Sequence, residues 1–376
     1  MDNVKTLTVK YHDRTVGTLA LYQDRLSAFE YDAQWLVDGF SISPLSLPLE
    51  KKVFIPNLDP FEGLFGVFAD SLPDGWGRLL VDRLLLKNHI NPHAMGGLDR
   101  LAIVGDSGMG ALTFEPEQPM DKHTNSNLSL DEIATECIQI LEVDFTKNLD
   151  TLFMLGGSSG GARPKILTQI NEEDWIIKFA SSNYSNVIGQ QEYDYANCAK
   201  KCGLQISDVR LFPSTICNGY FGTKRFDRVI TNGYANRIHM ISAAALLETS
   251  HRIPNLDYDL LMRLTLQLTD DMAECEKLFR LMCFNVFAHN RDDHSKNFSY
   301  LYLEAEKRWV LSPAYDLTYS NSLGGEHATT VHGNGISPSL ADIFAVAKEI
   351  GISPRKAKSI ANQVQECVTE ELSQYL

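Results

Sequence analysis

Three oxygen-bearing side chains lie in and just beyond one short polar stretch of the chain. The stretch 289–297 reads His-Asn-Arg-Asp-Asp-His-Ser-Lys-Asn and contains Asp292 and Asn297, and Asp316 follows 19 residues after Asn297. Carboxylate and amide oxygens are ligands that Mg²⁺ accepts. Two apolar segments, 298–303 and 308–311, flank a polar turn and predict a hairpin. Because a hairpin brings its two ends together, we expect Asn297 and Asp316 to lie close and to share one ion.

This set of side chains is suited to phosphoryl transfer. One carboxylate accepts or orients the attacking hydroxyl, while an amide oxygen and a second carboxylate hold the Mg²⁺ that bridges the nucleotide phosphates. Protein kinases place the base Asp five residues before the Asn. Asp292 has that spacing to Asn297, whereas Asp293 is only four residues away, so we expect Asp292 to be the base and leave the role of Asp293 open. Lys296 could steady the transferred phosphate as a point charge.

Two other interpretations of the same stretch are possible. It could be a polar loop held by its own side-chain hydrogen bonds, with Asp316 as an ordinary turn residue. A metal site built on His289 and His294 is the second, but the two do not have the i, i+4 spacing of a helical metal pair. The Asp–Asn pair, the hairpin and the second Asp together favour phosphoryl transfer.

A glycine-rich loop supplies a candidate phosphate-binding element. Residues 156–165 read Gly-Gly-Ser-Ser-Gly-Gly-Ala-Arg-Pro-Lys. Glycines allow successive backbone N–H groups to approach an anion. The loop is neither a Walker A sequence nor the glycine-rich motif of protein kinases, so a plain glycine turn is the alternative.

A lysine on an expected strand supplies a candidate partner for those phosphates. Lys178 lies in the apolar run 175–179, which resembles the V-A-I-K strand of kinases. An edge-strand lysine facing water is the alternative. Glu192, on the next expected helix, could pair with Lys178 as kinases pair theirs, although Asp194 competes for that role. The run from Phe221 to Arg228 falls where a hinge between two lobes is expected and could present backbone groups to an adenine.

The elements expected to position these residues change in type along the chain. Short strands are expected in 4–30, a helical stretch with a break at Ser71–Gly75 in 64–90, a strand at 111–114 and a linker in 115–130. Ser129 and Glu132 form a capping box that predicts a helix start. Strands are expected to dominate up to about residue 230, with a helix at 186–202. Beyond it, helices are expected at 240–250, 257–268, 271–289, 338–350 and 354–374.

Composition restricts the class of protein. The 376 residues are 44% apolar, enough for two or three compact units, and 34 Lys and Arg against 48 Asp and Glu give a net charge of −14. An acidic surface disfavours direct binding to nucleic acid or anionic lipid. The N-terminus lacks signal-peptide features, and no window approaches 18 apolar residues, so we expect a cytoplasmic protein without a membrane span. The seven cysteines are expected to be buried thiols, because Cys198 and Cys202 have no second ligand pair at zinc spacing.

Taken together, these motifs resemble those of the HipA family of bacterial serine/threonine kinases, the toxins of toxin–antitoxin pairs. The resemblance spans nearly the whole chain and rests on Phe68–Gly77, the loop ending at Lys165, Ile177-Lys178, Arg225–Arg228, Asp292–Ser299 and Pro313–Leu317. The chain departs from the family in being shorter than its longest members, mainly after Asp316, and in carrying Arg163-Pro164 where others often have Gln-Glu.

The resemblance implies a role for each matching position. Asp292 would be the catalytic base, and Asn297 and Asp316 would hold Mg²⁺. The residues that contact ATP would be Ser158, Ser159, Gly160, Gly161, Ala162, Arg163, Lys165, Lys178, Lys224, Arg225, Phe226, His294 and Lys296. Family members can silence themselves by autophosphorylating a serine in the loop, for which Ser158 is the best positional match and Ser159 the alternative. Phosphate there would repel the phosphates that the loop binds.

The resemblance also implies partners and a biological role. It implies a helix-turn-helix, HipB-like antitoxin that binds operator DNA, so that this chain would contact DNA only indirectly. It implies a protein substrate in translation, such as an aminoacyl-tRNA synthetase, and a role in growth inhibition and persistence. A small-molecule phosphotransferase of the aminoglycoside- or choline-kinase type and a pseudokinase scaffold are the alternatives. The extra N-terminal region argues against the former, and the intact catalytic residues argue against the latter.

The expected fold is α+β, a protein-kinase-like bilobal fold with a strand-rich N-lobe, an all-helical C-lobe and an extra N-terminal α/β subdomain. The expected division is an N-terminal subdomain at 1–115, a linker at 116–128, a nucleotide-binding N-lobe at 129–230 and a C-lobe with the catalytic loop and metal site at 231–376.

Overall fold

The computed structural model describes residues 3–118, 128–142, 148–181, 186–231 and 234–376. The chain forms two compact units, each built from several segments. The first comprises Met1–Gly189, Leu211–Ile241 and Ala245–Thr249, and the second comprises Gln190–Arg210, Ser242–Ala244 and Ser250–Leu376. The expected linker falls largely on 119–127, outside the described residues, and the four-part division stays a prediction.

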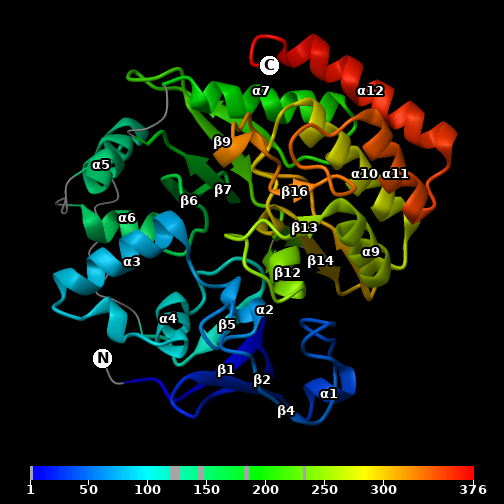
Figure 1. The fold of residues 1–376 in the computed structure, drawn as a ribbon. Coiled ribbons are helices and arrows are strands. Elements are labelled where there is room, and N and C mark those ends of the chain that lie inside the picture. The colour runs from blue at the N-terminus through cyan, green and yellow to red at the C-terminus, as the bar shows by residue number, and fades with distance from the viewer. Residues whose placement is uncertain (1–2, 119–127, 143–147, 182–185, 232–233) are drawn as a thin grey trace. The chain divides into compact units, whose positions relative to one another are not determined.

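An antiparallel sheet opens the first unit (Figure 1). Its strands, in the order β4-β3-β2-β1-β5, are β1 (Thr6–Tyr11), β2 (Arg14–Tyr22), β3 (Leu26–Tyr31), β4 (Val53–Phe54) and β5 (Leu112–Glu115). Leu7, Val9 and Tyr11 alternate with more exposed residues along β1, so one face of the sheet is buried. The expected strands in 4–30 and at 111–114 are confirmed.

Helices lie between the last three strands of this sheet along the chain. They are α1 (Trp35–Asp38), α2 (Gly66–Ala69), α3 (Gly75–Lys87), the 3₁₀ turn η1 (Pro92–Ala94) and α4 (Gly97–Val104). The expected break inside 64–90 is confirmed, because α2 ends at Ala69 and α3 begins at Gly75 after an extended Asp74. Phe29 and Phe68 pack at the centre of this part of the unit.

A second sheet of the first unit carries the glycine-rich loop. It has the order β6-β7-β9-β8, with β6 (Lys165–Ile170), β7 (Glu173–Lys178), β8 (Val209–Phe212) and β9 (Tyr220–Lys224), and two helices precede it, α5 (Leu130–Glu142) and α6 (Leu149–Gly156). The capping box at the start of α5 is confirmed, since the Ser129 N–H donates to the Glu132 carboxylate at 2.7 Å. Trp76 and Leu80 of α3 share a core with Cys137 of α5 and Ile177 of β7, so the N-terminal segment and this sheet pack on one another.

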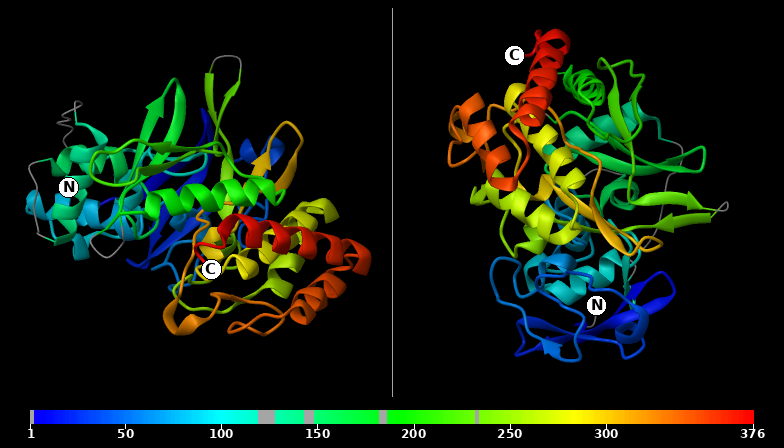
Figure 2. Two further views of the ribbon diagram at one scale, coloured as in Figure 1. Left: turned by 90° about the horizontal axis from the view of Figure 1, so that it is seen from above. Right: turned by 90° about the vertical axis from the view of Figure 1, so that its right-hand side faces the viewer.

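Helices form most of the second unit. They are α7 (Ile188–Lys201), α9 (Tyr258–Thr269), α10 (Met272–Phe287), α11 (Leu340–Ile350) and α12 (Pro354–Leu372). The buried α10 packs against α9 and α12, and Figure 2 shows the C-terminal helix α12, drawn in red, beside the yellow α10. The helices expected at 186–202, 257–268, 271–289, 338–350 and 354–374 are therefore confirmed.

The prediction of an all-helical C-lobe is wrong. The region after residue 231 also contains β11 (Tyr234–Arg237), β12 (His239–Ser242), an antiparallel hairpin of β14 (Ser299–Leu303) and β15 (Arg308–Leu311), and a parallel pair of β13 (Leu256–Asp257) and β16 (Thr329–Thr330). The hairpin was expected. The two-residue strands β13 and β16 pair across 73 positions of sequence, a contact that no local pattern reveals.

The helix expected at 240–250 is mostly absent. Only α8 (Ala243–Leu246) is helical, because Met240 and Ile241 belong to β12. Beyond α8, Glu248 adopts a left-handed backbone (φ 48°), and its carboxylate accepts from the Gly66 N–H at the start of α2. This tertiary hydrogen bond holds Glu248 in a non-helical conformation, although the local sequence favours a helix up to residue 250. The sequence also did not predict α6, which precedes β6 in the strand-rich part, or the hairpin of β10 (Arg228–Thr231) with β11.

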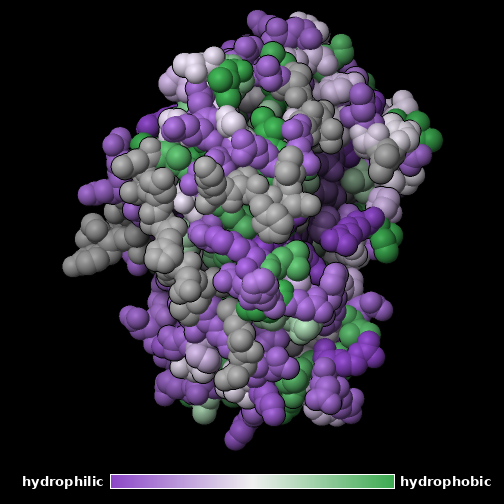
Figure 3. Space-filling model, turned by 90° about the vertical axis from the view of Figure 1, so that its left-hand side faces the viewer, coloured by the Kyte–Doolittle hydropathy of each residue, from purple (hydrophilic) through white to green (hydrophobic). Residues whose placement is uncertain are grey.

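The surface agrees with the composition. The face drawn in Figure 3 is mostly hydrophilic, with single hydrophobic side chains scattered over it, as expected for a chain of net charge −14. Among the described residues, no helix combines the length and the apolar character that crossing a bilayer requires.

Candidate active site

The loop that carries Asp292 is held firmly at its start. Asp271 caps α10 by accepting from the Ala273 N–H, and the helix ends after Phe287. His289 then turns the chain with a left-handed backbone (φ 51°). Asn290 is buried, pairs in a parallel bridge with Ser320 and donates from its side chain to the Asn285 amide oxygen at 2.9 Å. The loop therefore leaves a rigid helix along a fixed path.

Asp293 anchors the middle of this loop inside the second unit. Its side chain has no exposed surface, and its carboxylate accepts from the Tyr258 hydroxyl at 2.9 Å, from the Thr329 N–H at 3.2 Å and from the His327 ring at 3.0 Å. The Tyr258 hydroxyl in turn accepts from Asn285 at 2.9 Å. The role left open for Asp293 is thus a structural one: it ties the loop to the segment around β16.

Asp292, one residue earlier, lies at the surface of the second unit. Its side chain keeps 65% of its surface exposed, and its carboxylate lies 4.0 Å from the His294 ring. The pKa of Asp292 is raised above its usual value, chiefly by reduced hydration; His294 opposes the shift, and the carboxylates of Asp316 and Asp293 add to it. A raised pKa is typical of a carboxylate that must accept a proton.

The hairpin brings the neighbourhoods of Asn297 and Asp316 together. Ser312 donates to the Ser299 carbonyl at 2.8 Å and so closes the open end of the β14–β15 hairpin. The Tyr315 hydroxyl donates to the Lys296 carbonyl at 2.6 Å, which joins the residues next to Asn297 and Asp316. The expectation that the two lie near each other is consistent with these contacts.

The side chains in this region suit a hard cation. Asn297 donates from its amide nitrogen to the Asp292 carbonyl at 2.7 Å, which orients the amide while its oxygen remains an acceptor. Asp316 has a left-handed backbone (φ 55°), and its negative charge contributes to the raised pKa of Asp292. Two carboxylates and one amide oxygen in one neighbourhood fit Mg²⁺, whose ligands are oxygens. The assignment of Asn297 and Asp316 as its ligands stays a prediction.

His294 and Lys296 lie in the same loop. Lys296 belongs to the 3₁₀ turn η2 (Ser295–Asn297), which His294 precedes. The centre of the His294 ring lies 5.3 Å from that of the His251 ring, with the two rings tilted by 53°. The buried Nδ1 of His294 has no hydrogen-bond partner in the described part of the chain. Both residues remain candidates for contact with a nucleotide. Among the described residues, neither His289 nor His294 belongs to a group of three or more side chains that could hold a metal ion.

The glycine-rich loop of the first unit rests on a segment that sequence reasoning treated only as a turn and a family signature. The Gly161 N–H donates to the Asp74 carboxylate, and the Trp76 N–H donates to the Gly161 carbonyl at 2.9 Å. The Trp76 indole donates to the Lys165 carbonyl at 3.2 Å. A Cβ on Gly77 would lie 2.2 Å from the Ser159 carbonyl, so only glycine allows this approach. The Pro-Asp-Gly-Trp-Gly run at 73–77 was the available signal.

The two loop serines differ in exposure. Ser159 is only 2% exposed and donates from its hydroxyl to the Gly156 carbonyl at 2.5 Å. Ser158 is partly exposed. Gly161 has a positive φ (85°), as expected for a loop that turns its N–H groups toward one side.

Two lysines lie beneath this loop on one face of the second sheet. Lys165 and Lys178 face each other directly in the β6–β7 register, and each is only 7% exposed. Lys165 donates to the Gly160 carbonyl, and the Lys178 ammonium lies 5.6 Å from the centre of the Phe221 ring. Lys178 is therefore not the water-facing edge lysine that was the alternative. Both ammonium groups remain candidates for contact with an anionic ligand at the glycine-rich loop.

The side chains of the expected hinge are engaged within the first unit. Lys224 pairs with Glu173 at 2.6 Å, and Arg225 makes a bidentate ion pair with the fully buried Asp227 at 2.7 and 2.9 Å. Asp227 also accepts from Arg228 and from the Gly110 N–H. A contact to adenine at 224–226 would accordingly involve the backbone. Glu192, 2% exposed, belongs to the second unit and Lys178 to the first, and their pairing stays a prediction.

Comparison with known proteins identifies the family. Residues 7–115 match the family model of the HipA N-terminal domain, and residues 157–372 match that of the HipA-like C-terminal domain. Two proteins of Sinorhizobium fredii, named "Putative kinase Y4dM" and "Putative kinase Y4mE", are 24% and 26% identical over 332 and 351 residues. Each alignment covers 84% of this chain, and 78% and 77% of those proteins.

A solved structure shares the fold. HipA from Shewanella oneidensis MR-1, solved with HipB and its operator DNA, superposes with a TM-score of 0.71 at 17% identity, over 98% of this chain and 90% of that one. At that identity the likeness establishes a common fold. Since the C-terminal family model alone covers more than half of the residues, the chain belongs to the HipA family.

Proposed function

We propose that the chain is an ATP- and Mg²⁺-dependent serine/threonine protein kinase of the HipA type. The observation that carries the proposal is the contrast between adjacent carboxylates: Asp293 is buried and anchored, whereas Asp292 is exposed with a raised pKa, beside Asn297 and Asp316. Membership in the HipA family and the kinase names of the relatives support it.

In this proposal each group has one task. Asp292 accepts the proton of the attacking hydroxyl, and Lys296 and Lys178 bind phosphate oxygens. The Asn297 and Asp316 oxygens hold Mg²⁺, which would neutralise charge on the nucleotide phosphates. The backbone N–H groups of the 156–165 loop would cover those phosphates, with the loop positioned by Asp74 and Trp76.

We propose further that Ser158 is the autophosphorylated residue. Ser158 is partly exposed, while the Ser159 hydroxyl is buried and bound to the Gly156 carbonyl. A phosphate of about −1.5 to −2 charges in this loop would compete with the nucleotide phosphates and silence the enzyme. Phosphopeptide mass spectrometry after incubation with ATP should find phosphate on Ser158. Phosphate on Ser159 with Ser158 bare would transfer the switch to the alternative serine.

As a HipA-type toxin, the chain would be restrained by a HipB-like helix-turn-helix antitoxin and would reach DNA only through it. The HipA of the Shewanella complex was solved with HipB and operator DNA. The substrate would be a protein of translation, such as an aminoacyl-tRNA synthetase. Induced expression should stop growth of the host, and the Asp292→Asn variant should not. Equal growth arrest by both proteins would separate toxicity from phosphoryl transfer.

The experiment that tests the kinase proposal uses γ-labelled ATP and Mg²⁺ with the purified chain, alone and with host lysate. We expect label on the chain itself and on a discrete lysate protein. Label on small molecules alone would favour the aminoglycoside- or choline-kinase alternative, and no label in any fraction would favour the pseudokinase.

A further inference from the structure

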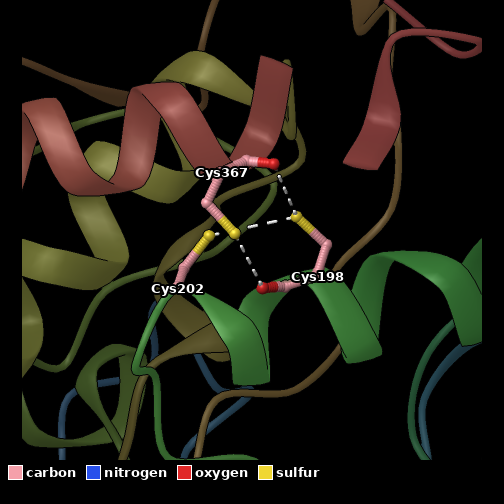
Figure 4. Close-up of side chains that lie close together, drawn as sticks. All are labelled: Cys198, Cys202 and Cys367. Carbon is pink, nitrogen blue, oxygen red and sulfur yellow. Dashed lines mark hydrogen bonds between the residues drawn. The ribbon is translucent and has the colours of Figure 1, made fainter. Parts of the chain in front are cut away.

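Three thiols, none of them among the candidate active-site residues, converge at one place in the second unit. Cys198 lies near the C-terminal end of α7, Cys202 follows that end, and Cys367 lies on α12 (Figure 4). Their sulfur atoms all lie within 4.8 Å of one another. Cys198 and Cys202 are 1% and 0% exposed, and Cys367 is partly exposed. The sequence offered only the Cys198–Cys202 pair, and the fold supplies the third thiol.

The spacing of the sulfurs suits one metal ion better than a disulfide. With metal–sulfur bonds of about 2.3 Å, sulfurs around one ion lie about 3.8 Å apart in a tetrahedral site and about 4.0 Å apart in a trigonal one. The Cys198 and Cys202 sulfurs are 3.9 Å apart. A disulfide needs a sulfur–sulfur distance of about 2.05 Å, which would require much larger movement of buried side chains.

The three sulfurs also make long contacts with nearby carbonyls. The Cys198 sulfur lies 4.0 Å from the Cys367 carbonyl, the Cys367 sulfur 3.9 Å from the Cys198 carbonyl, and the Cys202 sulfur 4.0 Å from the Val364 carbonyl. A bound metal ion would hold these sulfurs as thiolates, because metal ligands must be deprotonated. Arg280 donates to the Cys202 carbonyl at 2.8 Å, and this cation would offset part of the added negative charge.

We propose that Cys198, Cys202 and Cys367 bind one thiophilic metal ion, Zn²⁺ or Cu⁺, which joins α12 to α7. Thiolates select these ions over the hard Mg²⁺ of the candidate active site. Cu⁺ is satisfied by three sulfurs. Zn²⁺ takes a fourth ligand, either water or the Glu371 carboxylate, which lies one turn beyond Cys367 and now pairs with Lys201 at 2.6 Å.

The test uses the full chain, purified under reducing conditions and freed of metal. It is titrated with Zn²⁺ in air-free buffer and, in a second arm, with Cu⁺ against a competing Cu⁺ chelator. The variants are Cys367→Ser, whose thiol is partly exposed, and Cys198→Ser as an independent second. Cys283→Ser, a buried thiol on α10 outside the cluster, is the matched control.

We expect one equivalent of one of the two ions to survive desalting on the wild type and on Cys283→Ser. Loss of an outer partner of a metal ligand costs 10- to 100-fold in affinity, so loss of a ligand itself should cost more than about 100-fold in either cluster variant. The bound ion should raise the midpoint temperature of thermal unfolding of the wild type. The proposal would be overturned if the wild type retained less than a tenth of an equivalent of either metal ion. It would also be overturned if the cluster variants bound the ion as tightly as the wild type. An intact mass lower by two hydrogen atoms, with a disulfide mapped to these cysteines in the reduced preparation, would show that the thiols form a disulfide and would overturn the metal proposal.

Discussion

At the scale of single residues, the candidate site contains two adjacent aspartates, one buried and one exposed. The Asp293 carboxylate accepts hydrogen bonds from Tyr258, Thr329 and His327 in a fully buried position. The Asp292 carboxylate keeps most of its surface. The two neighbouring carboxylates therefore have different environments, and the contacts that bury Asp293 also fix the backbone from which the proposed base projects.

Exchanging each aspartate for asparagine should separate the two roles. Asp293→Asn leaves buried donors without a charged acceptor, and we expect it to lower the free energy of unfolding by about 2–4 kcal/mol. Asp292→Asn touches an exposed side chain and should leave the midpoint of thermal unfolding nearly unchanged. Calorimetry of both variants beside wild type measures this. Equal midpoints for the two variants would contradict the anchoring role of Asp293.

The raised pKa of Asp292 gives a direct prediction. Reduced hydration raises the pKa, and the carboxylates of Asp316 and Asp293 raise it further, while His294 lowers it. Removing the charge of Asp316 by Asp316→Asn should therefore lower the pKa of Asp292, whereas His294→Ala should raise it. Carboxyl-carbon NMR titration without Mg²⁺ reads the pKa without any need for activity. An unchanged pKa in Asp316→Asn would show that the two carboxylates do not interact.

At the scale of elements, the glycine-rich loop depends on the start of α3. Asp74 accepts from the Gly161 N–H, and the Trp76 backbone and indole donate to the loop and to its following strand. The contact spans 87 positions of sequence, which is why the pattern at 73–77 predicted only a turn. The helix break, the capping box and the hairpin, by contrast, are local and were predicted correctly.

Removing the Asp74 charge should loosen this loop. A hydrogen bond to a charged group contributes about 1.5–3 kcal/mol, so Asp74→Asn should raise the KM for ATP about 10-fold or more while kcat changes less. Asp24→Asn is the matched control, an exposed aspartate of the same unit with no role in the loop. Steady-state kinetics over a range of ATP concentrations tests this. A fall in kcat at constant KM would place Asp74 in the chemical step instead.

The buried ion-pair cluster of the first unit should make its stability depend on acid. Burial acts to raise the pKa of Asp227, but Arg225 and Arg228 outweigh it and hold the pKa at about 2, below the ordinary 3.8. A lowered pKa stabilises the folded state above pH 3.8 and loses that stabilisation as the pH falls toward 2, on the order of 2 kcal/mol. Asp227→Asn should destabilise the protein by about 3–5 kcal/mol at neutral pH. It should also remove this loss of stability between pH 3.8 and pH 2. Urea unfolding from pH 2 to 6 tests both effects. If the free energy of unfolding of the variant still decreases at low pH, other carboxylates cause that decrease.

At the scale of the whole molecule, the local elements around the candidate site were easier to predict from the sequence than the contacts between distant segments. The spacing of Asp292, Asn297 and Asp316 is a local pattern, and the hairpin that joins their surroundings is present. The interleaved segments of the two units, the strands β13 and β16, and the third thiol at Cys367 all require contacts between distant segments. Such contacts follow from packing and leave no periodic trace in the sequence.

We propose that this HipA-family chain transfers the γ-phosphoryl group of ATP and uses Asp292 as the base. The most direct measurement is the rate of autophosphorylation with γ-labelled ATP and Mg²⁺, for wild type, Asp292→Asn and the exposed control Asp208→Asn. A positioned general base contributes about 10²–10⁴ in rate, so Asp292→Asn should lose that factor while Asp208→Asn keeps the wild-type rate. Autophosphorylation of Asp292→Asn at the wild-type rate would contradict the proposed role of Asp292 as the base.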